Sequence, residues 1–483
     1  MFYSFYLSVL AFLLFIFLWK RKQFKHNYPP GFPNWPILGS LPHLKDADLL
    51  HFAIKDWAKK YGQVISVHLG LHKGLFVTGA DNVLAALRKP EFQGRPDSHT
   101  IRERSFGQKS LGVFFSEGDH WSSSRKFTVR QLRAFGAVRT EEFMAKEIIE
   151  LVDSIQDGVE QEITGLFALS VVNFFWFIIA SRRFKPDDKM IKLFLAGNKS
   201  FFRNGNPKGS TADVFPILKH FDKSYQSRLQ HIRKTQRLVK ELIEEQRSIL
   251  DKNNPVNLID HYLVEISKGE AQNDFTEEGL IMICFDIFSA GAEPVSAAFD
   301  FILLYMVLYP EVQKKMQEEI DAVLGKSRRP MLEDKNSLHY TMAVIEEVTR
   351  TNPTAPIAVP HKCTTNTYFN DYYVEQDTMV LLDLHSLGFD EKYWKNPDVF
   401  QPERFLDADG KFKKSNILYP FGIGQRSCAG ETISKNLIFL FVATFFEKFT
   451  LSLPKNAPKP STMCDPGFTI GCKPFKAVIT SRY

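Results

Sequence analysis

The stretch FGIGQRSCAG (residues 421–430) lies near the carboxyl end of the chain and places one cysteine inside a glycine-rich loop. The apolar pattern that follows, from Glu431 to about Phe446, predicts a helix. Cys428 would then stand at the start of that helix, where unpaired backbone N–H groups and the positive end of the helix dipole stabilise a thiolate. We therefore interpret Cys428 as a metal ligand.

Other residues of this loop suit a flat, acidic cofactor beside the cysteine. Gly424 and Gly430 leave room for a macrocycle that lies against the backbone, and Phe421 can shield the sulfur from water. Arg426 can pair with an acidic group at the cofactor edge. For a lone Gly-x-Gly, a structural cysteine in an ordinary turn would be the better interpretation. The full order F-x-x-G-x-R-x-C-x-G is far more specific, and it resembles the haem-binding loop of the cytochrome P450 family.

Length and composition fit one large domain with a sizeable apolar core. The chain has 483 residues, of which 44% are hydrophobic and 13% aromatic. No linker-like segment divides it after residue 40, so we expect a haem-binding catalytic domain over residues 41–483. The net charge of +6 is mild, which suits an acidic partner or a membrane surface, and no nucleic-acid motif is present. Five scattered cysteines favour a reducing compartment over a disulfide framework.

Residues 1–19 are predicted to be a transmembrane anchor. This run is uncharged, and a helix of its length rises about 27 Å, close to the thickness of a thin bilayer. Cations at residues 20–22 place the catalytic domain on the cytosolic side. The alternative is a cleaved signal peptide, but such a peptide has a basic start and small residues at its end, and this run has neither. Residues 20–40 are predicted to be a basic stop-transfer segment and a stiff hinge around PPGFPNWP (29–36), similar to that of microsomal family members.

The rest of the chain predicts a mainly α fold with a small β region. Residues 64–70 and 74–77 read as a strand hairpin, followed by a helix over residues 81–88. Long helices are expected over residues 141–155, 162–179, 189–203 and 224–251. A breaker-rich loop at residues 204–210 resembles the mobile lid of the family. We expect a single helical domain of the cytochrome P450 type behind an N-terminal transmembrane helix.

The resemblance implies further contacts to the haem propionates. Trp121 and Arg125 share one helical face, and both could reach these groups, although W-x-x-x-R alone more often marks a surface pair. His361, in Ala358-Val359-Pro360-His361, is a further propionate contact or else a satisfied surface histidine.

A buried ionic network is implied as well. Glu347 and Arg350 lie one helical turn apart, and Arg404 belongs to a P-E-R-F segment that resembles the family's. An E-x-x-R pair alone is usually a solvated surface pair. With the P-E-R-F segment present, we assign these three residues a structural role that haem retention requires.

The central helix, predicted over residues 277–308, departs from the family pattern. The family reads A/G-G-x-D/E-T-T/S, and this chain keeps Ala290, Gly291 and Glu293 but has Pro294 in place of the threonine. We predict that these four residues form the catalytic dioxygen site, with Glu293 delivering protons. A proline inside a helix removes an N–H and clashes with the preceding turn, so the helix should bend.

A substrate pocket is predicted from segments that match the family's substrate contacts. Aromatic and small apolar side chains exclude water and orient an apolar guest. The predicted residues are Phe114, Phe115, Phe201, Phe202, Phe288, Ala355, Ile357, Phe468 and Thr469.

The resulting prediction is an oxidoreductase: a monooxygenase of the endoplasmic reticulum membrane, single-pass and cytosolic, with haem b. It would act on a small apolar substrate and O2, and NADPH-cytochrome reductase would supply electrons, because the chain has no flavin or dinucleotide motif. Epoxidation of a terpenoid, such as a juvenile-hormone precursor, and N-hydroxylation of an amino acid to an oxime are both compatible with Pro294.

Two other functions stay open. A reductase-independent peroxide isomerase or lyase is possible, since some family members with that chemistry also lack the threonine. Glu293 and the uninterrupted loop around Cys428 favour the monooxygenase. A haem carrier or sensor would explain the propionate contacts but not the acid beside the oxygen site.

Overall fold

The structure is a computed structural model. It describes residues 6, 10, 11, 26–108, 110–135, 138–203, 205, 211–269, 275–325 and 328–483. Most of the predicted anchor (1–19) and of the predicted lid (204–210) lies outside the described residues.

Helices account for about half of the chain, as the mainly α prediction requires. The α-helices are α2 (Leu50–Tyr61), α3 (Ala80–Arg88), α4 (His99–Arg104), α5 (Gly118–Phe135), α6 (Val138–Ser154), α7 (Ala168–Ala180), α8 (Lys189–Arg203), α9 (Thr211–Val214), α10 (Lys223–Ile249), α11 (Leu258–Ser267), α12 (Glu277–Leu308), α13 (Pro310–Leu324), α14 (His339–Thr351), α15 (Ser386–Phe389) and α16 (Glu431–Lys448). Short 3-10 helices are η1 (Leu41–His43), η2 (Pro90–Phe92), η3 (Pro216–His220), η4 (Leu332–Asn336) and η5 (Pro402–Phe405).

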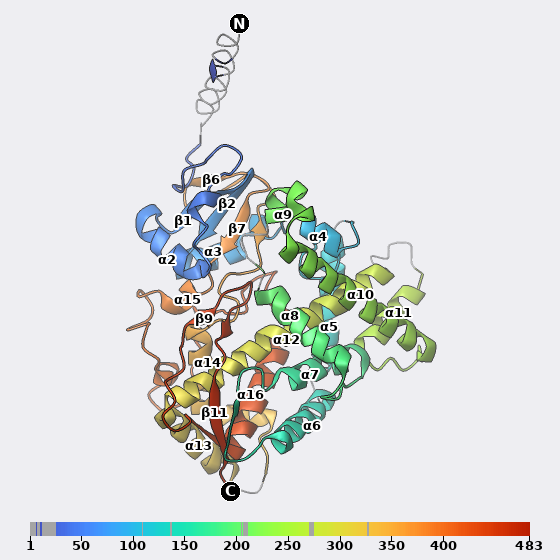
Figure 1. The fold of residues 1–483 in the computed structure, drawn as a ribbon, viewed down its shortest axis with the longest axis vertical. Coiled ribbons are helices and arrows are strands. Elements are labelled where there is room, and N and C mark those ends of the chain that lie inside the picture. The colour runs from blue at the N-terminus through green and yellow to red at the C-terminus, as the bar shows by residue number, and fades with distance from the viewer. Residues whose placement is uncertain are drawn as a thin grey trace.

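The strands form small, separate sheets. They are β1 (Val64–Leu69), β2 (His72–Val77), β3 (Val159–Glu162), β4 (His361–Lys362), β5 (Thr367–Phe369), β6 (Tyr372–Val374), β7 (Met379–Leu382), β8 (Phe449–Ser452), β9 (Cys464–Asp465), β10 (Gly471–Cys472) and β11 (Lys476–Ser481). The largest sheet has the order β1-β2-β7-β4, and β2 pairs with β7 in parallel. It therefore joins the early hairpin to a segment late in the chain, at one end of the molecule, while β11 lies near the C-terminus at the other end (Figure 1).

The core is built around α12. This helix crosses the middle of the molecule and contacts α7, α10 and α16, which surround it (Figure 1). It begins where the Thr276 side chain accepts a hydrogen bond from Gly279, and it ends just before Pro310 starts α13. Among the described residues, α12 is the one helix long and apolar enough to cross a membrane, but 78% of its most apolar window is buried, as in a core helix.

The bounds predicted for α8 and α12 agree with the structure, and so does the hairpin of β1 and β2. The helix predicted over residues 162–179 begins later, at Ala168. Residues 159–162 instead pair with β11 as β3, and Gly165 has a φ of 84°, which an α-helix does not allow.

Candidate functional site

Cys428 lies at the end of the glycine-rich loop, immediately before α16. Its backbone N–H donates to the Phe421 carbonyl over 2.8 Å, which closes the loop. The side chain opens onto an internal cavity of about 300 Å³. Burial raises the pKa of the Cys428 thiol, while the hydrogen bond from Gly430 N–H acts in the opposite direction. A bound metal ion deprotonates a coordinating cysteine.

Gly424 differs from its predicted role. It does not line the cavity, and Gly422 and Gly430 do. Gly424 has a φ of 84°, and a Cβ there would lie 2.8 Å from the Leu87 carbonyl oxygen. The glycine is thus required by the turn and by the close approach of α3, rather than by a macrocycle.

Cationic side chains gather on one side of this cavity. Arg125 (α5) donates to the Ser427 carbonyl over 2.6 Å, and Arg426 donates to the Gln93 carbonyl over 2.8 Å. Arg95, which the sequence did not single out, lines the same cavity. Burial lowers the pKa of Arg95, and the neighbouring Arg426 and Arg125 lower it further. Their mutual repulsion in a buried place shows that the cluster is suited to an anionic ligand.

Trp121 (α5) belongs to this cluster. The Arg426 guanidinium lies 3.7 Å from the centre of its ring. Within the described part of the chain, its buried indole N–H has no hydrogen-bond partner. A buried donor without an acceptor is costly, so this N–H also fits a ligand with acidic groups at its edge.

His361 lines the cavity, and one of its two ring nitrogens is already engaged by the chain. Its Nδ1 lies 2.6 Å from the Phe92 carbonyl oxygen, so Nδ1 carries the proton and Nε2 is an acceptor in the neutral ring. Burial, followed by the charge on Arg95, holds the pKa of His361 well below its ordinary value. Arg95 is therefore better placed than His361 to hold an acidic group.

These residues fit a haem. A thiol faces the cavity from one loop, and a buried cationic cluster with an unpaired N–H could hold two propionates. Cys428 would hold the iron, and Arg95, Arg125, Arg426 and Trp121 would hold the acidic edge.

The α12 residues predicted at the oxygen site divide into two groups. Ala290, Gly291 and Pro294 line the cavity. The helix runs through Pro294 without a break, and the Ala290 carbonyl lacks the usual N–H donor because proline has none. A Cβ at Gly291 would lie 2.5 Å from the Phe175 ring, so packing against α7 also demands a small residue there.

Glu293 is the correction among them. Glu293 does not line the cavity; its carboxylate forms an ion pair with Arg203 at the end of α8 and accepts a hydrogen bond from the Thr469 hydroxyl. Arg203 also donates to the Thr469 carbonyl over 2.8 Å. Burial raises the pKa of Glu293, and Arg203 opposes this shift. Glu293 thus joins three segments of the chain, and it reaches the cavity only through Thr469, whose side chain lines it.

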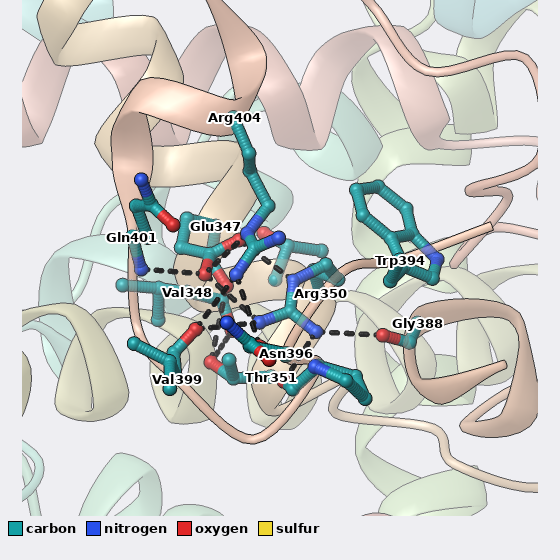
Figure 2. A network of polar contacts seen from close by, with 12 residues as sticks. Glu347, Val348, Arg350, Thr351, Gly388, Trp394, Asn396, Val399, Gln401 and Arg404 are labelled. Atoms are coloured by element: carbon teal, nitrogen blue, oxygen red, sulfur yellow. Dashed lines mark hydrogen bonds and ion pairs between the residues drawn. The ribbon is translucent and has the colours of Figure 1, made fainter. Parts of the chain in front are cut away.

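The structure brings Glu347, Arg350 and Arg404 together, as Figure 2 shows. Arg350 forms two hydrogen bonds to the Glu347 carboxylate, at 2.7 and 2.8 Å, and Arg404 Nε donates to it over 3.1 Å. Arg350 and Glu347 are completely buried, and Arg350 also donates to the Gly388 carbonyl. This network ties α14 to η5 and the segment after α15.

The predicted substrate residues mostly line cavities. Six of them border the cavity at Cys428, namely Phe114, Phe202, Ala355, Ile357, Phe468 and Thr469. Phe115 and Phe201 line a second cavity of about 1050 Å³, which shares Phe114, Ala290 and Phe468 with the first. Phe288 is different, because it is fully buried in the core and stacks on Phe194, with ring centres 3.8 Å apart.

Comparison with known proteins agrees with this geometry. A family model described as cytochrome P450 matches residues 29–479. The chain is 31% identical to the farnesoate epoxidase of Bombyx mori, over 99% of this chain and 98% of that protein. It is 32% identical to cytochrome P450 2C3 of Oryctolagus cuniculus (92% of this chain, 91% of the relative) and 34% identical to cytochrome P450 2J2 of Homo sapiens (93% and 90%). The chain therefore belongs to the cytochrome P450 family, whose microsomal members are haem-containing monooxygenases that use NADPH-derived electrons supplied by a reductase.

Proposed function

We propose that this chain inserts one oxygen atom of O2 into a small or medium apolar substrate, and that terpenoid epoxidation is its reaction. The observation that carries the proposal is the cavity at Cys428, whose wall beyond the cationic cluster is mainly apolar. Phe114, Ile357 and Phe468 contribute to that wall. Such a wall binds an apolar guest by removing its surface from water.

Haem, when bound, activates O2 with two electrons from NADPH, so that one oxygen atom enters the substrate and the other leaves as water. The residues of the chain prepare this chemistry. Cys428 would hold the iron, and Arg95, Arg125 and Arg426 would hold the acidic edge of the haem. Ala290 lines the cavity and would leave room there for dioxygen, and its carbonyl, which lacks the N–H donor that Pro294 removes, could hold a water that carries protons.

The relative from Bombyx mori is named for epoxidation of farnesoate, which is an apolar isoprenoid chain with a polar end. A substrate of this class matches the mainly apolar wall better than an amino acid, which carries an ammonium group that would also need a buried partner. N-hydroxylation of an amino acid remains compatible with Pro294, but no contact in the cavity specifically favours it.

The decisive experiment supplies the purified protein with NADPH-cytochrome reductase, NADPH and a farnesoate-type sesquiterpenoid. We expect an epoxide whose formation requires NADPH and reductase. Conversion of an organic peroxide to a rearranged product without reductase would instead identify the isomerase or lyase. Turnover of aromatic amino acids, with no terpenoid product, would refute the proposed substrate class.

We propose further that the protein is held at the endoplasmic reticulum membrane by a single span within residues 1–19, with residues 20–40 as stop-transfer and hinge and the catalytic domain (41–483) in the cytosol. Deletion of residues 1–25 should release the protein from microsomes into carbonate while haem binding persists. Carbonate-resistant attachment of the truncated protein would contradict a single span.

A further inference from the structure

A loop late in the chain contributes to the boundary between the two cavities. The loop spans residues 466–470, between β9 and β10. Three phenylalanines from different segments line both the cavity at Cys428 and the second cavity, namely Phe114, Phe202 and Phe468. The centre of the Phe468 ring lies 6.3 Å from the ring centres of each of the other two. The position of this loop therefore helps to set where the cavity at Cys428 ends.

The loop is fastened to the end of α8 and to α12. The Phe468 N–H donates to the Phe202 carbonyl over 2.8 Å, and Arg203 Nη1 donates to the Thr469 carbonyl over 2.8 Å. Arg203 Nη2 forms the ion pair with Glu293, whose carboxylate also accepts the hydrogen bond from the Thr469 hydroxyl. One guanidinium thus joins the loop, α8 and α12, although Arg203 itself lines neither cavity.

Two glycines show how closely the hairpin packs on Arg203. A Cβ at Gly467 would lie 2.6 Å from the Phe202 carbonyl oxygen and 2.8 Å from the Arg203 Cα. A Cβ at Gly471 would lie 2.0 Å from Arg203 Nη2. Any side chain at these two positions would therefore push the hairpin away from α8, and the absence of side chains there lets the guanidinium reach the loop.

The geometry of the guanidinium is the informative feature of this ion pair. The side chains of Arg203 and Glu293 are only 16% and 8% exposed, and an ion pair withdrawn from water adds little net stability compared with apolar packing. A guanidinium, however, carries several N–H donors in fixed directions. Arg203 uses them to hold a carboxylate of α12 and a carbonyl of the loop at once. Such an arrangement suits the placement of the loop more than the gain of stability.

We infer that Arg203 is a positioning residue for substrate recognition. It holds the Phe468 ring at the boundary of the cavity at Cys428, and so limits how far a substrate extends toward the second cavity. This inference rests on the proposed binding of an apolar substrate at Cys428 and adds the residue that sets the length of that substrate. Without the guanidinium, a short substrate should lose contact with the Phe468 ring, whereas a long one should gain room.

The test measures dissociation constants of the haem-loaded protein by calorimetry, which requires no turnover. The ligands are a monoterpene alcohol and a diterpene alcohol, which have the same end group and differ in length. Arg203→Met combined with Glu293→Gln removes the guanidinium without leaving a buried charge. This variant should bind the short alcohol about tenfold more weakly, as expected for lost contact with one aromatic ring, and should bind the long alcohol as tightly as the wild-type protein or more tightly.

Combination with Phe468→Ala separates positioning from general damage to the fold. If Arg203 acts through the Phe468 ring, Phe468→Ala alone should change the ratio of the two dissociation constants in the same direction. Addition of Arg203→Met with Glu293→Gln to Phe468→Ala should then alter that ratio less than about twofold. Arg247→Met with Glu277→Gln is the matched control, because it removes an exposed ion pair between α10 and α12, and it should leave the ratio unchanged.

An equal loss of affinity for both alcohols in Arg203→Met with Glu293→Gln would overturn the inference, because Arg203 would then support only the fold. A change in the ratio that is as large with Phe468→Ala as without it would also overturn it. Failure of the wild-type protein to bind either alcohol would refute the proposed substrate class and this inference with it. Length-dependent binding without any epoxide in the turnover assay would support the role of Arg203 and refute only the proposed reaction.

Discussion

Replacement of Arg203 by methionine breaks the ion pair that joins the end of α8 to α12. In the structure, Glu293 would keep the hydrogen bond from Thr469 and would become a buried carboxylate without its paired cation. Loss of one partner from a buried pair costs about 3 to 5 kcal/mol. The Arg203 side chain is 16% exposed, so solvent screens part of the interaction, and we expect a loss of about 3 kcal/mol in the free energy of unfolding at neutral pH.

The loss should depend on pH in a defined direction. Burial already raises the pKa of Glu293 above its ordinary value of 4.5, and removal of Arg203 raises it further. A carboxyl whose pKa is higher in the folded state gives stability at low pH that disappears as pH rises through the folded pKa. The deficit of Arg203→Met against the wild-type protein should therefore be small near pH 5 and grow toward pH 8.

Urea unfolding at several pH values measures this difference. In a Glu293→Gln background there is no carboxyl to titrate at this position, so Arg203→Met should there lower the free energy of unfolding by the same amount at every pH. Arg182→Met, which breaks an exposed pair with Glu245, should change stability by less than about 1 kcal/mol. A deficit for Arg203→Met that is constant with pH, or larger at pH 5, would refute the assignment of Glu293 as a buried charged partner.

Three further predictions concern the rest of the site. Glu347→Ala leaves buried arginines unpaired, so it should lower the free energy of unfolding by about 3 to 5 kcal/mol and release haem on gel filtration. The exposed Glu318→Ala should retain haem. Equal haem content in the two variants would contradict a structural network. Pro294→Thr restores a helix N–H, so it should raise the free energy of unfolding by up to about 3 kcal/mol and change the coupling of NADPH consumption to product formation. Unchanged coupling and products would make the proline a neutral variant. Phe114→Ala with Phe468→Ala should abolish the Soret shift on binding an apolar substrate, and a shift of normal size and midpoint would exclude these rings from the binding site.

The parts of the site that the sequence predicted well are those set by local pattern. The loop around Cys428 is contiguous, so its order alone predicted the cysteine as a ligand, and the helix predicted after it is present as α16. Glu347 and Arg350 lie one turn apart on α14, and the segment that supplies Arg404 is a recognisable motif. In each of these cases the sequence spacing is also the spatial arrangement.

The errors arose where partners come from distant segments. The sequence placed Glu293 at the oxygen site by its position on α12, but its actual partners, Arg203 and Thr469, lie 90 and 176 residues away. Arg95 belongs to no motif, and only the fold brings it beside Arg426. Phe288 could not be separated from the pocket residues, because a phenylalanine on a core helix has the same local sequence whether its ring faces a cavity or another helix.

We propose that Cys428 is the ligand of the haem iron. The most direct measurement is the absorption spectrum of the reduced protein with carbon monoxide. The wild-type protein should show the Soret band of a thiolate-bound haem, and so should Cys363→Ala, which removes a buried cysteine that does not line the cavity. Cys428→Ala should lose that band while circular dichroism shows the helices intact. A thiolate-type band that persists in Cys428→Ala would show that another residue binds the iron, and would contradict this account of the site.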